Sequence, residues 1–261
     1  MSMITSKIDV VPFLFRCHNW AELVVPILLH RPTPHIIFRN GVRFLAPDLH
    51  WREVAAIHLK HIYTPPPLPI LREDIVVDIG ANIGLFTIYA ASRTNKTVYA
   101  FEPSPSTFAC LQHNISTNEL TNVILERLAV SDRQGKELLF ESNNREIRRL
   151  ERFAATVPEE ALDVPENYLE VSTTTLQDIM DRNHIEQLDF LKVDCEGAEA
   201  LILQSTPMHY LKRVKKIALE YHDHMTPTPH QKLHRLLREA GFIVRERHHF
   251  GPYGYLYGWR V

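Results

Sequence analysis

Acidic residues and glycines are combined in the middle of the chain in a way that predicts ligand binding. Asp78 lies within the apolar run 75–79 and precedes Gly80 and Gly84. Two glycines between a buried strand and a helix permit a sharp turn and a close approach of backbone to ligand. The segment 77–84, Val-Asp-Ile-Gly-Ala-Asn-Ile-Gly, therefore predicts a ligand-binding turn.

The charges near this turn indicate which ligand it binds. A dinucleotide turn would show G-x-G-x-x-G, whereas here an acid precedes the first glycine and the middle glycine is absent. Asp78 would repel a pyrophosphate but favour the amino group and positive sulfur of a methionyl sulfonium compound. Glu102, after the run 97–101, is placed to accept ribose hydroxyls. Asp132 is a candidate acceptor for an adenine amino group, although a turn aspartate often bonds its own backbone. We therefore predict S-adenosyl-L-methionine as the cofactor.

A second group of polar residues follows two later apolar runs. Asp194 and Glu196 follow the run 188–193, and Glu220 and His222 lie at the end of the run 214–221. Ligands of open α/β sheets bind at the carboxyl ends of the strands. Methyl transfer requires a nucleophile that is held within about 3 to 3.5 Å of the methyl carbon and that loses its proton. We predict that these four residues are catalytic. Asp194, Glu220 and His222 could converge as general bases or as ligands of a divalent cation, a choice that their spacing leaves open, and we assign no metal.

The order of elements predicts the architecture that positions these residues. From residue 74 onward the pattern alternates strand, turn and helix, with strands expected at 75–79, 97–101 and 122–130 among others. The short connection between 242–247 and 255–261 makes the last strand pair antiparallel. We predict an α/β domain over 74–261 with a Rossmann-like, seven-stranded, mostly parallel sheet containing one antiparallel strand.

The N-terminal segment 1–73 and an insert at 141–170 differ from this pattern. The prolines of 64–69 end the N-terminal segment, in which Asn40-Gly41 predicts a two-residue hairpin turn and 51–61 a short helix. We expect this extension to cover the site as a lid or to contact a second copy of the chain. In the insert, four arginines lie at helical spacings: Arg145, Arg148, Arg149 and Arg152.

Composition narrows the class of protein. The chain has 261 residues, 45% hydrophobic content and a formal net charge of −2, so it supplies no field that would gather nucleic acid. Its 3 cysteines fit neither a disulfide framework nor a metal knuckle. The apolar stretch 21–29 is too short to span a bilayer and contains a proline. We expect a cytoplasmic protein that binds neither nucleic acid nor membrane.

Four ordered blocks of the sequence resemble the FkbM family of methyltransferases. They are 77–84, the Ala-Phe-Glu-Pro-Ser-Pro of 100–105, the Leu-Ala-Val-Ser-Asp-Arg-Gln-Gly of 128–135, and the Asp-Phe-Leu-Lys-Val-Asp-Cys-Glu-Gly-Ala-Glu of 189–199. The resemblance implies a class I methyltransferase sheet, S-adenosyl-L-methionine as donor, and O-methylation of a sugar, natural product or carboxylate. Cys195, where the family usually has an aliphatic residue, and the insert before Val171 depart from the family pattern.

These arguments define one preferred function and two alternatives. We expect an S-adenosyl-L-methionine-dependent methyltransferase that acts on a small-molecule or glycan acceptor, and a homodimer is compatible with the sequence. A nicotinamide-dependent oxidoreductase and a non-catalytic cofactor-binding protein are the alternatives. The predicted cofactor-binding residues are Asp78, Gly80, Ala81, Asn82, Gly84, Phe86, Glu102, Pro103, Ser131, Asp132 and Asp194.

Overall fold

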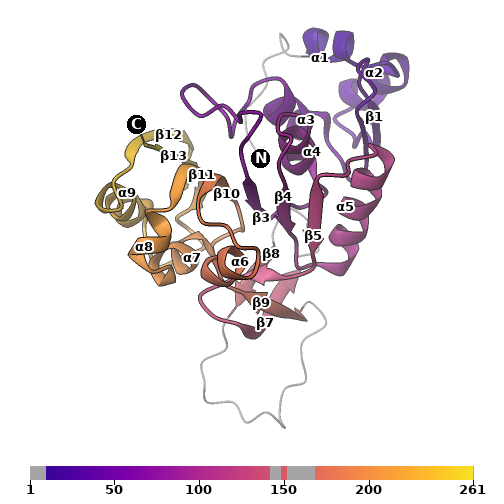
Figure 1. Ribbon diagram of the computed structural model, residues 1–261. Coiled ribbons are helices and arrows are strands. Elements are labelled where there is room, and N and C mark those ends of the chain that lie inside the picture. The colour runs from indigo at the N-terminus through magenta and orange to yellow at the C-terminus, as the bar shows by residue number, and fades with distance from the viewer. Residues whose placement is uncertain (1–9, 142–147, 152–167, 261) are drawn as a thin grey trace.

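A seven-stranded sheet forms the centre of the computed structural model, which describes residues 10–141, 148–151 and 168–260 (Figure 1). The strand order is β12-β13-β11-β10-β3-β4-β5. β13 pairs antiparallel with β11 and β12, and the other neighbours pair in parallel. The predicted mostly parallel sheet with one antiparallel strand is confirmed. Its strands are β3 (Val76–Ile79), β4 (Val98–Phe101), β5 (Val123–Glu126), β10 (Leu188–Val193), β11 (Val214–His222), β12 (Ile243–Phe250) and β13 (Tyr253–Trp259).

Helices cover both faces of this sheet, because successive residues of its buried strands point to opposite sides. In β3, Val77 and Ile79 belong to the hydrophobic cluster that includes one set of helices, whereas Val76 packs with the cluster on the other face. The first set is α6 (Leu176–Arg182), α7 (Glu199–Ser205), α8 (Met208–Leu211) and α9 (His230–Glu239). The second set is α3 (Trp51–His58), α4 (Leu85–Ala91) and α5 (Pro105–Thr117).

A smaller sheet lies below the main one in Figure 1, in the strand order β6-β9-β7-β8. The strands are β6 (Ala129–Val130), β7 (Gly135–Glu141), β8 (Arg148–Glu151) and β9 (Tyr168–Thr174). The predicted continuous strand over 122–130 is wrong. β5 is the edge of the main sheet and ends at Glu126, and Ala129 and Val130 pair with β9 instead.

The arginine-rich segment also differs from expectation. Arg148 and Arg149 lie on strand β8, which pairs antiparallel with β7, so the helical interpretation of their spacing is wrong. Pairing with a neighbouring strand outweighs the weak local preference for helix. Arg145 and Arg152 lie outside the described residues.

The N-terminal elements pack on α5. They are α1 (Val10–Arg16), α2 (Trp20–Leu28), β1 (His35–Ile37) and β2 (Arg43–Leu45), with β1 and β2 forming the predicted antiparallel hairpin. Its loop has three residues rather than two, since Phe38 N donates to Val42 O at 2.8 Å. Leu45 N donates to Asn114 Oδ1 on α5 at 2.8 Å. None of the described helices combines the length and the apolar character that crossing a membrane requires.

Candidate active site

The turn between β3 and α4 packs directly against the chain that leaves β10. Gly80 has a φ of +75°, a left-handed conformation that favours glycine. A Cβ placed on Gly80 would lie 1.8 Å from the backbone O of Asp194, so no side chain fits there. Asn82 also has a positive φ, and its backbone N donates to Glu102 Oε2 at 3.0 Å. The predicted ligand-binding turn is therefore fixed between Asp194 and Glu102.

Asp78 is fully buried, and a cation within the protein compensates its charge. Asp78 on β3 and Lys192 on β10 are register partners, and Lys192 Nζ lies 3.2 Å from Asp78 Oδ1. Thr87 Oγ1 donates to Asp78 Oδ2 at 2.6 Å. Burial lowers the pKa of Lys192, but the charges of Asp78 and Asp194 outweigh burial and hold that pKa above its usual range. Lys192 therefore stays charged and connects the buried acid to Asp194.

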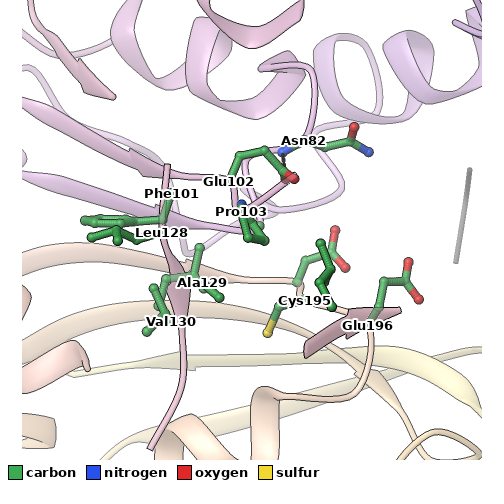
Figure 2. Close-up of a pocket in the computed structure, with 13 residues that line it drawn as sticks. Asn82, Phe101, Glu102, Pro103, Leu128, Ala129, Val130, Cys195 and Glu196 are labelled. Carbon is green, nitrogen blue, oxygen red and sulfur yellow. Dashed lines mark hydrogen bonds between the residues drawn. The ribbon is translucent and has the colours of Figure 1, made fainter. Parts of the chain in front are cut away.

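A pocket lies at the carboxyl ends of β3, β4 and β10, between the ligand-binding turn and the smaller sheet (Figure 2). Glu102 reaches it with both carboxylate oxygens held, since Oε1 accepts from Ser104 N and Oε2 from Asn82 N, each at 3.0 Å. Six of the predicted site residues line this pocket: Gly80, Asn82, Glu102, Pro103, Asp194 and Glu196. The other lining residues are Ile79, Phe101, Leu128, Ala129, Val130, Leu139 and Cys195.

Several predicted cofactor residues lie behind the pocket rather than in its wall. Ala81 and Gly84 pack against the core near α5, where a Cβ on Gly84 would lie 2.6 Å from Leu111 Cδ1. Phe86 is buried, with its ring centroid 5.8 Å from that of Phe190. Ser131 Oγ donates to Glu137 at 3.1 Å, and neither Ser131 nor Asp132 is among the lining residues.

Asp194 and Glu220 are brought together, as predicted, by the ends of β10 and β11. Tyr63 Oη lies 2.8 Å from Asp194 Oδ2 and 2.8 Å from Glu220 Oε2. Burial and the charge of Asp194 raise the pKa of Glu220 to about 7. Asp194 also lies 3.6 Å from Lys192 Nζ and is partly exposed, so it connects the pocket with this buried group.

His222 forms a second part of the same cluster. Its Nδ1 lies 2.9 Å from Glu199 Oε1, and its Nε2 lies 3.4 Å from Glu196 Oε2. Burial lowers the pKa of His222, but Glu199 and Glu196 outweigh burial and raise that pKa to about 10. Burial also raises the pKa of Glu196, to about 8. Oxygen and nitrogen atoms of Asp194, Glu199 and His222 lie within 4.8 Å of one another, a spacing that also suits a divalent cation.

Glu199 supports the loop after β10. Its carboxylate is 1% exposed and accepts from the backbone N of Cys195 at 3.1 Å and of Gly197 at 3.0 Å. The structure shows a carboxylate that fixes both the loop and the ring of His222.

Besides Glu199, two residues of the cluster were not predicted as site residues, Lys192 and Tyr63. Lys192 had a signal in the sequence, since a lysine inside the apolar strand 188–193 must find a buried anion. Tyr63 had none, because the irregular, proline-rich segment 61–69 gives no periodicity that would place a side chain. Both residues contact Asp194.

Comparison with known proteins places the chain among methyltransferases. The Methyltransferase FkbM domain matches residues 78–244. The 31-O-demethyl-FK506 methyltransferase FkbM of Streptomyces tacrolimicus is 28% identical over 193 residues, covering 66% of this chain and 73% of the relative. Methyltransferase sdnD of Sordaria araneosa is 26% identical over 254 residues, covering 84% of this chain and 93% of the relative. Hexuronic acid methyltransferase AglP of Haloferax volcanii is 24% identical over 185 residues, covering 67% and 71%.

Among solved structures, precorrin-6y C5,15-methyltransferase from Geobacter metallireducens aligns with a TM-score of 0.45 at 15% identity. The alignment covers 80% of this chain and 89% of that protein. The main sheet, with its single antiparallel strand β13, has the Rossmann-like architecture of class I methyltransferases. With the domain match extending from β3 to β12, the chain belongs to the FkbM family of methyltransferases.

Proposed function

We propose that this protein transfers the methyl group of S-adenosyl-L-methionine to an oxygen atom of a small-molecule or glycan acceptor. The observation that carries this proposal is the pocket between Glu102 and Asp194, into which the ligand-binding turn and an acidic cluster both open. When bound, the cofactor supplies a methyl group on a positively charged sulfur. The protein must then hold the donor and the acceptor in line and receive a proton.

The residues of the pocket suit an adenosyl group. Glu102 Oε2 accepts from Asn82 N and Oε1 from Ser104 N, and a carboxylate oxygen can accept more than one hydrogen bond, so both oxygens can also accept from ribose hydroxyls. Phe101, Leu128 and Val130 supply an apolar wall for a base. The chemistry of the lining side chains therefore agrees with the predicted cofactor.

The charge around Asp194 favours a cation in the pocket. Within the described part of the chain, Lys192 and His222 are the cationic partners of Asp78, Asp194, Glu196 and Glu199. Since the pKa of Glu196 is raised to about 8, the carboxylates of Asp78, Asp194 and Glu199 face two cations at neutral pH, and Asp194 lines the pocket. A sulfonium is stabilised by such a surplus, whereas the pyrophosphate of a nicotinamide cofactor is repelled.

The acceptor class rests on chemistry and on the names of relatives. Asp194, at the wall of the pocket, is a carboxylate that can receive a hydroxyl proton, which O-methylation releases. One relative is named for an O-demethyl substrate and another for a hexuronic acid. We therefore propose a hydroxylated natural product or a sugar acid as the acceptor.

Calorimetric titration tests the cofactor. We expect S-adenosyl-L-methionine to bind and NAD not to bind. Glu102→Ala should weaken binding by about 1 to 3 kcal/mol if the carboxylate accepts ribose hydroxyls. Glu119→Ala, on an exposed turn after α5, is the matched control. Unchanged affinity in Glu102→Ala would remove Glu102 from the cofactor site.

Transfer of the tritiated methyl group of S-adenosyl-L-methionine tests catalysis. The acceptors are a panel of hexuronic acids, 31-O-demethyl-FK506 and other hydroxylated natural products, with an extract of the source cells as a further arm. Cofactor binding without transfer in any arm favours the non-catalytic alternative. Labelled product stable to mild base indicates an ether, whereas base-labile label indicates a methyl ester.

The outer surface of α1 and α2 supports a contact between two copies of the chain. Six large apolar side chains on α1, on α2 and at the residue after α2 are at least half exposed: Val11, Phe15, Trp20, Val25, Leu28 and Leu29. The two helices contact each other, and exposed apolar surface of this kind is typical of an interface. Sedimentation velocity should show a dimer that Phe15→Glu dissociates; a wild-type monomer at high concentration contradicts this.

A further inference from the structure

The hydroxyl of Tyr63 joins two carboxyls from separate strands. Asp194 follows β10, Glu220 lies on β11, and the Tyr63 Oη is 2.8 Å from an oxygen of each. These residues are separated by 131 and 157 positions in the sequence. Tyr63 also lies before the segment matched by the family domain, which begins at residue 78.

The ring of Tyr63 is fixed by packing, so the position of its hydroxyl is determined. Tyr63 is 6% exposed, and its ring centroid lies 5.5 Å from that of Phe86 and 5.9 Å from that of Tyr255, both edge to face. Lys192 Nζ lies 5.4 Å from the same ring. An oriented hydroxyl in such surroundings holds a carboxylate in one rotamer.

The single hydrogen of the Tyr63 hydroxyl limits which hydrogen bonds Tyr63, Asp194 and Glu220 can form together. A tyrosine hydroxyl has one hydrogen to donate, yet it lies at hydrogen-bonding distance from two carboxyl oxygens. When Tyr63 donates to Asp194, the second contact is a full hydrogen bond only if Glu220 carries a proton and donates it to Tyr63 Oη. Asp194 then remains the carboxylate, next to Lys192 and at the wall of the pocket.

We propose that Tyr63 is a positioning residue for methyl transfer, which orients Asp194 toward the acceptor while Glu220 supports it from behind. This inference rests on the proposed function. In the step it serves, the acceptor O–H bond breaks, its oxygen forms the bond to the methyl carbon, and its proton passes to Asp194. The carbon–sulfur bond of the donor breaks and its electron pair stays on sulfur, so Tyr63 itself is unchanged.

Tyr63→Phe tests this role, because it removes one oxygen atom and keeps the packed ring. The matched control is Tyr257→Phe: Tyr257 Oη donates to the backbone O of Ile62 at 2.7 Å, so this variant loosens the same segment without touching a carboxyl. Both variants are measured for binding of S-adenosyl-L-homocysteine by calorimetry and for tritiated methyl transfer into the acceptor that the wild type labels. Proton NMR of the free proteins follows the slowly exchanging hydroxyl protons.

We expect Tyr63→Phe to keep its affinity for S-adenosyl-L-homocysteine within about twofold and to lose transfer by about tenfold or more. Tyr257→Phe should keep both, and a downfield hydroxyl resonance should disappear in Tyr63→Phe alone. Wild-type transfer in Tyr63→Phe, an equal loss in Tyr257→Phe, or no such resonance in the wild type overturns the inference while the proposed function stands. A wild type that binds no S-adenosyl-L-homocysteine overturns the proposed function and the inference together.

Discussion

Replacing Gly80 with alanine should destabilise the protein through two separable effects. The backbone at Gly80 has a φ of +75°, and a left-handed alanine costs about 1 to 2 kcal/mol. The new Cβ would lie 1.8 Å from Asp194 O, so β3 and the loop after β10 must separate by about 1.6 Å to reach ordinary contact. Overpacking of this kind costs about 1 to 3 kcal/mol. We expect the free energy of unfolding to fall by about 2 to 5 kcal/mol in total.

Gly41→Ala separates the two effects. Gly41 has a φ of +92°, but a Cβ placed there meets no atom within 4 Å, so this variant should lose only the backbone cost. Urea unfolding followed by circular dichroism measures both variants, and calorimetry measures their affinity for S-adenosyl-L-methionine. Gly80→Ala should also bind the cofactor more weakly, since Asp194 and the turn line one pocket. Equal stability of the two variants would refute the close approach of Gly80 to Asp194.

Four further predictions concern the charged cluster. Burial and a neighbouring carboxylate raise the pKa of Glu220 from 4.5 to about 7. The free energy of unfolding of the wild type should therefore fall, relative to that of Glu220→Gln, by up to about 3 kcal/mol as the pH rises from about 4.5 through 7. Urea unfolding measures this difference, and a difference that does not change with pH contradicts the prediction. The pKa of His222 is raised from 6.5 to about 10, so its ion pairs stabilise the fold at neutral pH. The free energy of unfolding that His222→Gln loses relative to the wild type should therefore shrink as the pH rises through about 10. EDTA should leave the transfer rate unchanged, because both ring nitrogens of His222 are already paired with Glu196 and Glu199; loss of transfer restored by Mg²⁺ would show a cation site. Asp78→Asn should leave Lys192 to pair with Asp194 alone. The preference in binding for S-adenosyl-L-methionine over S-adenosyl-L-homocysteine, measured by calorimetry, should then fall by about 1 kcal/mol. An unchanged preference would contradict the coupling of Asp78 to Asp194 through Lys192.

The main sheet was predictable because its central strands are buried on both faces. The runs 75–79 and 188–193 are apolar apart from Asp78, Asp189 and Lys192, as suits parallel strands between two helical layers. The strand expected over 122–130 failed for the opposite reason. β5 is an edge strand with Ile124 44% exposed, and hydrophobicity alone did not show that Ala129 and Val130 leave it for the smaller sheet.

The acids of the site were predictable from the same strands, but their partners were not. Asp194 and Glu220 end neighbouring parallel strands, so their proximity follows from topology. Lys192 follows from strand register, which pairs it with Asp78, and register is not visible in one sequence. Tyr63 depends on tertiary packing of a segment without periodicity, so only the folded structure brings it to the cluster.

The structure changes where the charge that attracts a sulfonium is expected to lie. Sequence reasoning gave that role to Asp78, yet Asp78 is 0% exposed and shares Lys192 with Asp194, at 3.2 Å and 3.6 Å. Two carboxylates and one ammonium leave one negative charge, and it is favoured on Asp194, the member that water and the pocket reach. Asp78 thus acts on the pocket indirectly, because it competes with Asp194 for the charge of Lys192. Asp78 and Asp194 are therefore coupled electrostatically through Lys192.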